Sequence, residues 1–307
     1  MKSILGIGVN TLDYTISTNQ FPIEDSKNIG YENSNISAGG PIPNALVCLS
    51  RLGFSTTYVG NTSQDNQGDF IVNSLKNEGV DVSEVIRTAI EVNKSFIISN
   101  NVTNTRTVLW RKIPKSDYFE ISQIPYHKIK NSDVILIDGL EKKCTEEIVK
   151  YAKQENKEII YGAESVSQAK SLLPYVDILV APKNSIKKFI GVENEEDIMN
   201  FLMEFSLKKA FITEGENGSY GIDFNKKNIF YQQSFNIDVV DTTGAGDAFL
   251  GGIVYSTLNK KNMENSLIIA SAVSALNCLS LSGIKGLPNI VQLKQFLKNN
   301  NLEGILK

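Results

Sequence analysis

The stretch VVDTTGAGDAF, residues 239–249, joins an apolar run to a loop of small residues and then to Asp247. This order predicts a strand, a glycine loop and a helix over about residues 247–258. Several backbone N–H groups would then meet at a helix N-terminus, where unpaired donors and the helix dipole bind an anion. The small side chains of Gly244, Ala245 and Gly246 would let that anion approach the backbone closely.

Asp247 falls in the first turn of this predicted helix, where the helix dipole favours a carboxylate, so we expect its pKa to be low. Such a group is a weak base toward an unactivated alcohol. Phosphoryl transfer does not require a strong base, because the attacking hydroxyl can lose its proton late in a loose transition state. The loop would hold the charge of a transferring phosphate while Asp247 takes the proton of an incoming alcohol. The alternative interpretation is a glycine-rich turn in which Asp247 only caps the helix.

Predicted strands and helices alternate along the rest of the chain. Near-continuous apolar runs such as DVILIDG (133–139) and KEIIYGA (157–163) are typical of parallel strands covered by helices on both faces. The fold class is therefore α/β. Two segments, at about 14–38 and 92–112, instead alternate polar and apolar residues. They predict a small β-sheet lid inserted into a single domain over residues 1–307.

Composition argues against several classes of protein and partner. The 31 basic and 34 acidic residues are spread along the chain and give a net charge of −3, so no basic patch indicates a nucleic-acid partner. Cys48, Cys144 and Cys278 lack metal-ligand spacing and are typical of reduced thiols in a cytoplasmic protein. The single histidine, His127, lies in a predicted polar connector and leaves little room for a Ser-His-Asp triad.

One uncharged segment, residues 266–284, approaches the length of a membrane span. Its five serines and one asparagine make it only weakly hydrophobic. A helix packed inside the α/β domain explains it better than a membrane helix, so we expect no membrane partner.

Four motifs, in order, resemble those of the PfkB, or ribokinase-like, family of carbohydrate kinases, and the resemblance covers nearly the whole chain. The N-terminal signature of that family is similar to SAGGPIPNALVCLSRLGF (37–54), and its C-terminal signature to DTTGAGDAF (241–249). Its nucleotide-site pattern TxGxxG is similar to ITEGENGSYG (212–221), and its closing segment by the adenine pocket to GIKGLP (283–288). The last motif and the segments FPIEDSKN and NTRTVLW are most similar to the ketohexokinase- or fructokinase-like branch of the family.

The resemblance implies a ribokinase-like three-layer fold with a mostly parallel central sheet, and ATP and Mg²⁺ as ligands. It implies that Asp247 is the catalytic base and that the amides of Gly244, Ala245 and Gly246 form the anion hole. The implied sugar-binding residues are Asn10, Asp13, Gly39, Gly40 and Asn44. The implied nucleotide-binding residues are Asn184, Lys187, Thr213, Gly215, Gly218 and Asn277. Each of these also has a plainer interpretation as a turn, a cap or a surface residue.

Two further residues belong to the candidate site. Arg106, on the second lid segment, either reaches the phosphates and substrate when the lid closes or lies on the wet face of the lid. Asp241 is a candidate ligand for a monovalent cation such as K⁺.

One motif departs from the family pattern. Many members carry NxxE near the fifth strand, where the glutamate helps to order Mg²⁺ through water. This chain has Asn184 followed by Lys187 at the position expected for that glutamate. Either phosphates and water alone order the metal, or Lys187 contacts a phosphate directly.

The sequence therefore predicts an ATP-dependent kinase that phosphorylates a primary hydroxyl of a free monosaccharide, with a ketose such as fructose or a ribose-like sugar favoured. The alternatives are a kinase of a sugar phosphate or nucleoside on the same fold, or a non-catalytic sugar or nucleotide sensor. Exposed edges of lid strands often pair between subunits, so a homodimer through the lid is expected.

Overall fold

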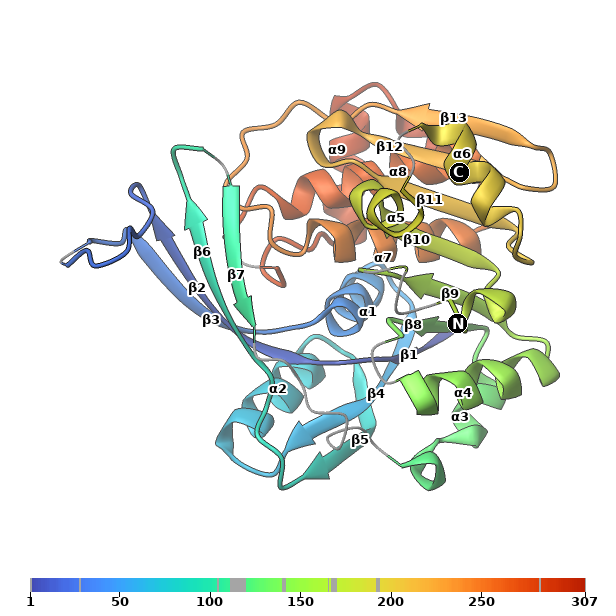
Figure 1. Cartoon of the computed structure of the whole chain (residues 1–307), viewed down its shortest axis with the longest axis horizontal. Coiled ribbons are helices and arrows are strands. Elements are labelled where there is room, and N and C mark those ends of the chain that lie inside the picture. The colour runs from blue at the N-terminus through green and yellow to red at the C-terminus, as the bar shows by residue number, and fades with distance from the viewer. Residues whose placement is uncertain are drawn as a thin grey trace.

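The computed structural model describes residues 2–27, 29–103, 105–110, 120–139, 142–164, 166, 170–191, 194–281 and 283–306. Two sheets organise these residues (Figure 1). The central sheet contains, in spatial order, β13 (Asn228–Gln232), β12 (Ser219–Asp223), β11 (Lys209–Thr213), β10 (Ile178–Pro182), β9 (Glu158–Gly162), β8 (Val134–Ile137), β1 (Ser3–Ile7), β4 (Ser55–Ser63) and β5 (Asp81–Thr88). All pairings from β11 to β5 are parallel, while β12 and β13 add antiparallel to that edge.

Helices cover both faces of this sheet. They are α1 (Pro41–Arg51), α2 (Asn66–Asn77), α3 (Tyr126–Asn131), α4 (Lys142–Gln154), α5 (Lys183–Ile190), α6 (Glu195–Leu202), α7 (Ala245–Leu258), α8 (Met263–Asn277) and α9 (Ile290–Asn299). Strand β8 shows why both faces are apolar. Its Val134 and Leu136 join one core with α1, α7 and α8, whereas Ile135 and Ile137 join a second core with α4. The predicted α/β class with a mostly parallel central sheet is confirmed.

The uncharged segment at 266–284 begins within α8, which is buried on most sides and packs against α7. Within the described part of the chain, no helix is long and apolar enough to cross a membrane. The buried-helix interpretation therefore accounts for residues 266–277 of this segment.

The second, smaller sheet is the lid. Its strands, in spatial order, are β3 (Asn33–Gly39), β2 (Thr11–Thr18), β6 (Lys94–Asn100) and β7 (Thr105–Trp110). It stands out from the central sheet at the left of Figure 1. The lid segments predicted from the sequence are 14–38 and 92–112, of which residues 28, 104, 111 and 112 lie outside the described part of the chain.

The two faces of the lid differ in polarity. Cross-strand partners share a face, so Asp13 of β2 lies on the same face as Ser37 of β3 and Ser95 of β6. The opposite face carries apolar partners, among them Tyr14 and Phe96, whose rings stack at 5.2 Å between centroids. The polar face is directed at the main domain, as the contacts of Arg106 described below establish.

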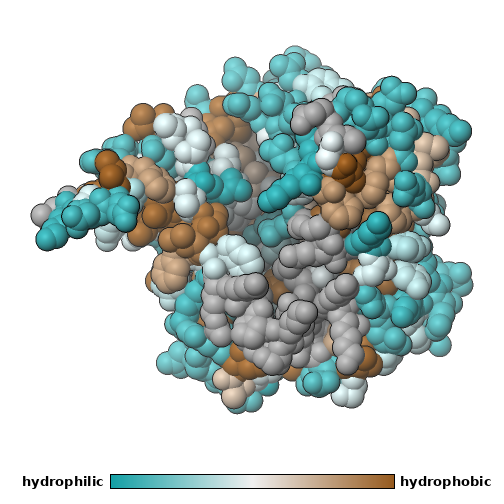
Figure 2. Space-filling model, viewed as in Figure 1, coloured by the Kyte–Doolittle hydropathy of each residue, from teal (hydrophilic) through white to brown (hydrophobic). Residues whose placement is uncertain are grey.

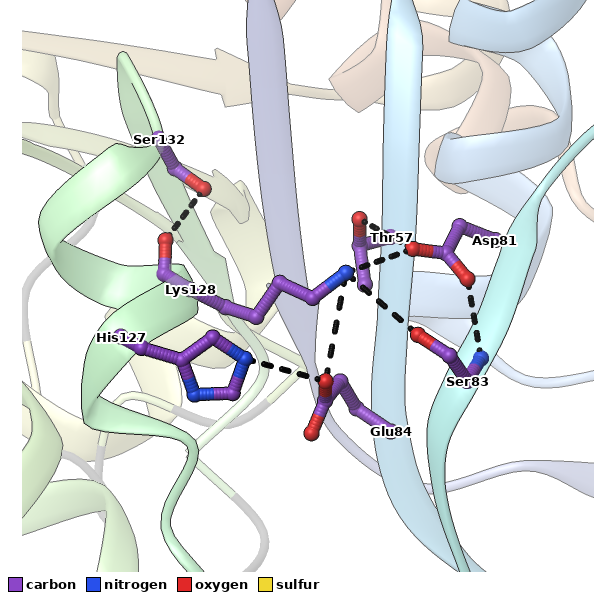
Figure 3. Close-up of polar contacts among 7 residues, drawn as sticks. All are labelled: Thr57, Asp81, Ser83, Glu84, His127, Lys128 and Ser132. Carbon is purple, nitrogen blue, oxygen red and sulfur yellow. Dashed lines mark hydrogen bonds and ion pairs between the residues drawn. The ribbon is translucent and has the colours of Figure 1, made fainter.

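At the other edge of the central sheet, a polar cluster holds α3 against β5 (Figure 3). Lys128 Nζ lies 2.7 Å from Asp81 Oδ2, and His127 Nε2 lies 3.3 Å from Glu84 Oε1. The expected polar connector around His127 is wrong in one respect, because these residues form the short helix α3. The His127 side chain is exposed, and its partner Glu84 is a carboxylate of the edge strand β5 that helps to hold α3 in place.

Candidate active site

The glycine loop meets helix α7 as the sequence predicted, with the helix starting at Ala245. Gly244 caps the helix at a φ of 77°, and a Cβ there would lie 2.9 Å from Gly283 Cα, so a side chain would be strained and crowded. Gly246 differs, because a Cβ built there meets no atom within 4 Å. The space beside Gly246 is therefore open to a ligand.

Two buried side chains, Asp241 and Asn277, form hydrogen bonds with this loop. Asp241 Oδ1 accepts hydrogen bonds from the backbone N and the Oγ1 of Thr243, at 2.9 and 2.8 Å. Asn277 Nδ2 donates to the Thr243 carbonyl oxygen at 2.9 Å. The Ala245 N–H donates to the Thr242 carbonyl oxygen at 3.2 Å, so this amide of the predicted anion hole already has a protein partner. Asn277 thus contacts the anion loop, and its assignment to the nucleotide stays a prediction.

Asp247 faces helix α1. Its Oδ2 accepts a hydrogen bond of 2.7 Å from Asn44 Nδ2. The pKa of Asp247 is raised to about 7, and burial is the largest cause. The charges of Glu164 and Asp13 also raise this pKa, while the hydrogen bond from Asn44 lowers it. The expectation of a low pKa is wrong, because desolvation and neighbouring carboxylates outweigh the helix dipole. A carboxylate with this pKa can accept a proton near neutral pH.

The acceptor end of the site is built on Asp13 and the glycine pair of the N-terminal motif. Asp13 is buried and accepts a hydrogen bond of 2.7 Å from Thr11 Oγ1, and its burial raises its pKa. A Cβ on Gly39 would lie 1.9 Å from Asp13 Oδ2, so the carboxylate packs directly on the glycine backbone. Gly40 has a φ of 110° and starts α1, which carries Asn44 toward Asp247.

Asn10 is buried, and its side chain is bonded to groups of β4. Its Nδ2 donates to the Tyr58 hydroxyl at 2.8 Å and to the Asn61 carbonyl oxygen at 2.5 Å. These bonds fasten the connection between β1 and β2 to β4. Its assignment to the substrate stays a prediction.

Arg106 links the lid to the anion loop. From β7 its guanidinium donates a hydrogen bond to Thr242 Oγ1. Arg106 therefore contacts the anion loop, and its contact with phosphates or substrate stays a prediction. The guanidinium also lowers the pKa values of Asp247 and Glu164, although burial dominates both. The lid thus adds a positive charge to a site that is otherwise rich in carboxylates.

The predicted nucleotide-binding residues other than Asn277 lie at or follow the carboxyl ends of β10 and β11. Thr213 ends β11, and Gly215 and Gly218 flank the following turn with φ values of 59° and 91°. A Cβ on Gly218 would lie 2.2 Å from the Gln232 carbonyl oxygen, so the turn packs closely on β13. Such strand ends are where ligands gather in open α/β sheets.

Helix α5, which follows β10, carries two of the predicted nucleotide-binding residues and a lysine that the sequence interpretation did not include. Asn184 is exposed in its first turn, and Lys187 is half-buried one turn further on. The sequence interpretation missed Lys183, the first residue of α5. It is buried, with its Nζ 2.9 Å from Glu214 Oε2 and 4.9 Å from the centroid of the Tyr220 ring.

Glu164 is a second residue that the sequence interpretation missed. It follows β9, and its carbonyl oxygen accepts a hydrogen bond of 2.5 Å from Ser185 Oγ in α5. Its carboxyl is close enough to Asp247 to raise the pKa of that residue. A signal was present, because Glu164 comes just after a buried apolar strand, as polar ligand-binding residues of parallel sheets do.

A divalent cation has few protein ligands in this site. Within the described ranges, no group of three or more His, Cys, Asp or Glu side chains is arranged to hold a metal ion. The residues present fit a Mg²⁺ that arrives with nucleotide phosphates and keeps most of its waters. Glu164 and Asp247 are then the nearby carboxylates able to hold those waters.

Three comparisons with known proteins agree with this geometry. Residues 1–290 match the family model described as pfkB family carbohydrate kinase. A curated relative, 5-dehydro-2-deoxygluconokinase of Clostridium perfringens, is 23% identical over 326 residues that cover 98% of this chain and 94% of the relative.

Solved structures share the fold at low identity. A putative ribokinase from Agrobacterium tumefaciens superposes with a TM-score of 0.89 at 19% identity, covering 98% of both chains. A putative ribokinase II from E. coli, in complex with ATP and Mg²⁺, gives a TM-score of 0.83 at 16% identity over 97% of this chain and 100% of that one. The ribokinase-like architecture expected from the sequence is confirmed.

Proposed function

Because this chain belongs to the pfkB family of carbohydrate kinases, and is a phosphotransferase with an alcohol group as acceptor, we propose that it transfers the γ-phosphate of ATP to a primary hydroxyl of a small unphosphorylated sugar or sugar derivative. One observation supports this proposal more strongly than the other observations do. The carboxyl of Asp247, with a pKa raised to about 7, lies beside an open glycine loop at the N-terminus of α7. This pairs a base with an anion site.

In the proposed reaction, the acceptor hydroxyl attacks the γ-phosphorus while the bond from that phosphorus to the bridging oxygen of ADP breaks. The proton of the hydroxyl passes to the carboxylate of Asp247, which Asn44 holds in place through its hydrogen bond of 2.7 Å. The first-turn N–H groups of α7 and the guanidinium of Arg106 stabilise the charge on the transferring group.

Mg²⁺, when bound with ATP, neutralises charge on the phosphates. We assign Glu164 the role of holding its water shell, in place of the glutamate that the NxxE pattern lacks in this chain. Asp241 stays a proposed ligand for a monovalent cation. A rate that is equal in K⁺ and in tetramethylammonium would contradict that assignment.

The acceptor is proposed to be unphosphorylated because carboxylates dominate the part of its site next to Asp247. Asp13 can accept hydrogen bonds from two hydroxyls of a sugar, and with Asp247 it would repel a phosphate. Several relatives are named 5-dehydro-2-deoxygluconokinase. A keto sugar acid should therefore be tested as an acceptor, together with fructose and ribose-like sugars. A sugar phosphate or nucleoside is the alternative acceptor.

An ATP-consumption screen over free sugars, sugar acids, sugar phosphates and nucleosides tests the proposal. We expect ADP release that requires both Mg²⁺ and one unphosphorylated acceptor. If ATP binds while the whole panel gives no turnover, the protein acts as a sensor and the kinase proposal is wrong.

We further propose that two copies pair through their lids. The outer lid face exposes Ile36, Phe96 and Leu109, whose exposed fractions are 53%, 49% and 58%. Figure 2 shows hydrophobic side chains gathered over the lid in this view. A second copy of the same face is the partner that would cover it. Light scattering should give a dimer for the wild type and a monomer for Phe96→Ser; a monomeric wild type would contradict this.

A further inference from the structure

Two polar side chains on the inner lid face each have one buried atom without a hydrogen-bond partner. Thr15 of β2 and Asn35 of β3 are direct cross-strand partners. Within the described residues, Thr15 Oγ1 and Asn35 Nδ2 are both buried without a hydrogen-bond partner. Thr15 is only 1% exposed. Buried polar groups of this kind are costly unless a ligand or water satisfies them, so the pair is a candidate for ligand contact.

The pair faces the candidate active site. Side chains alternate along a strand, so Thr15 points to the same lid face as Asp13, two residues earlier. Asn35 Oδ1 accepts a hydrogen bond of 2.7 Å from Lys285 Nζ, which comes from the segment between α8 and α9. Gly283 of that segment lies against Asn44, since a Cβ built on it would be 3.2 Å from Asn44 Nδ2.

The three groups offer hydrogen-bond donors and one positive charge. Asn35 presents an unpartnered N–H group, Thr15 a hydroxyl, and Lys285 an ammonium group. Asp13, by contrast, accepts hydrogen bonds from hydroxyls. Moving outward from Asp247, the site therefore offers a base, then an acceptor of hydroxyl donors, then a donor-rich end. A linear polyol with a carboxylate at one end matches that order.

We propose that Thr15, Asn35 and Lys285 form the subsite for the end of the acceptor remote from the transferred phosphate, and that this subsite binds a carboxylate. The acceptor is then a sugar acid rather than a neutral sugar. This inference rests on the proposed kinase function. A neutral sugar would satisfy Asp13 but leave the ammonium group of Lys285 without an anionic partner from the ligand.

Calorimetric binding of 5-keto-D-gluconate and of D-fructose, which have equal carbon counts, tests the subsite without requiring turnover. We expect the wild type to bind the acid more tightly than fructose. Lys285→Met should weaken acid binding by about tenfold to a hundredfold and leave fructose binding nearly unchanged. Lys285→Arg should restore much of the loss, and added salt should weaken acid binding alone.

Matched controls separate this effect from folding. Lys294 is exposed on α9, so Lys294→Met should change neither affinity. Thr15→Val should weaken acid binding, whereas Thr107→Val, on the outer lid face, should not. If Thr15→Val does not fold, the exposed Lys285 still provides the test.

Two results would overturn the subsite: equal affinity of the wild type for acid and fructose, or an equal loss for both ligands in Lys285→Met. Turnover distinguishes this failure from failure of the kinase proposal. If acids bind through Lys285 but no acceptor of the panel releases ADP with MgATP, the subsite is supported and the kinase proposal is contradicted. Phosphorylation of fructose but not of any acid supports the kinase and contradicts the subsite.

Discussion

The side chains of Asn44 and Asp247 meet at 2.7 Å although 203 residues separate them in the sequence. Each lies in the first turns of a helix that starts after a glycine of positive φ, Gly40 for α1 and Gly244 for α7. Packing of α1 on α7 in one core brings these two helix starts together. The amide therefore orients the carboxylate that we assign as the base, and the two family motifs form one site.

The two glycines of the anion loop should respond differently to a side chain. Gly246→Val should lower kcat by about a hundredfold or more at an unchanged Tm, because the added atoms occupy the open space where the phosphate approaches. Gly244→Ala should instead lower the Tm, since its φ of 77° and the nearby Gly283 backbone oppose a Cβ. Melting curves and initial rates measured on both variants and the wild type test this difference. A Gly246→Val protein whose activity falls only in step with its Tm would make the loop structural.

Asp13 should contribute to acceptor binding and not to ATP binding. Asp13→Ala should reduce kcat/KM for the acceptor strongly, because hydroxyls that bind the carboxylate lose a buried partner. ATP affinity measured without acceptor should stay within about twofold. Separate calorimetric titrations of the two ligands measure this. Equal losses for both would show that Asp13 maintains the fold rather than the acceptor pocket.

Lysines at two positions of α5 should differ in their effect on ATP. Lys183 begins the helix at the carboxyl end of β10, whereas Lys187 lies one turn further from that edge. We expect Lys183→Met to raise the KM for ATP and Lys187→Ala to leave it nearly unchanged. Initial rates at varied ATP measure both values. A large rise in the KM for Lys187→Ala would instead support direct contact of that lysine with a phosphate.

The raised pKa of Asp247 also predicts an effect on stability. Burial raises this pKa from 3.8 to about 7, so its favourable contribution is fully present below the lower value and is lost as pH rises through the higher one. Asp247→Asn removes that titration. The Tm of the variant relative to wild type should therefore be higher at about pH 8 than at about pH 4.5. Calorimetric melting at the two pH values checks this, and an identical Tm difference at both would contradict the raised pKa.

Apolar runs and motif order were sufficient to predict the central sheet and the lid, and they predicted the start of α7 to within two residues. The pKa of Asp247 could not be predicted, because the burial and the charges of Glu164 and Asp13 that set it come from distant parts of the chain. Thr15 and Asn35 were missed for a similar reason. Nothing in a polar residue of a strand indicates that its side chain is buried without a partner until the fold is known.

The kinetics of Asp247→Asn, beside the pH profile of the wild type, test the central claim most directly. With the best acceptor of the screen, kcat/KM of the wild type should fall as pH drops below about 7, because the base must be deprotonated to accept the proton. Asp247→Asn should bind ATP normally, lower kcat by about 10² to 10⁴ and lose that pH dependence. A variant with kcat within about threefold of wild type, and the same pH profile, would remove Asp247 from the reaction.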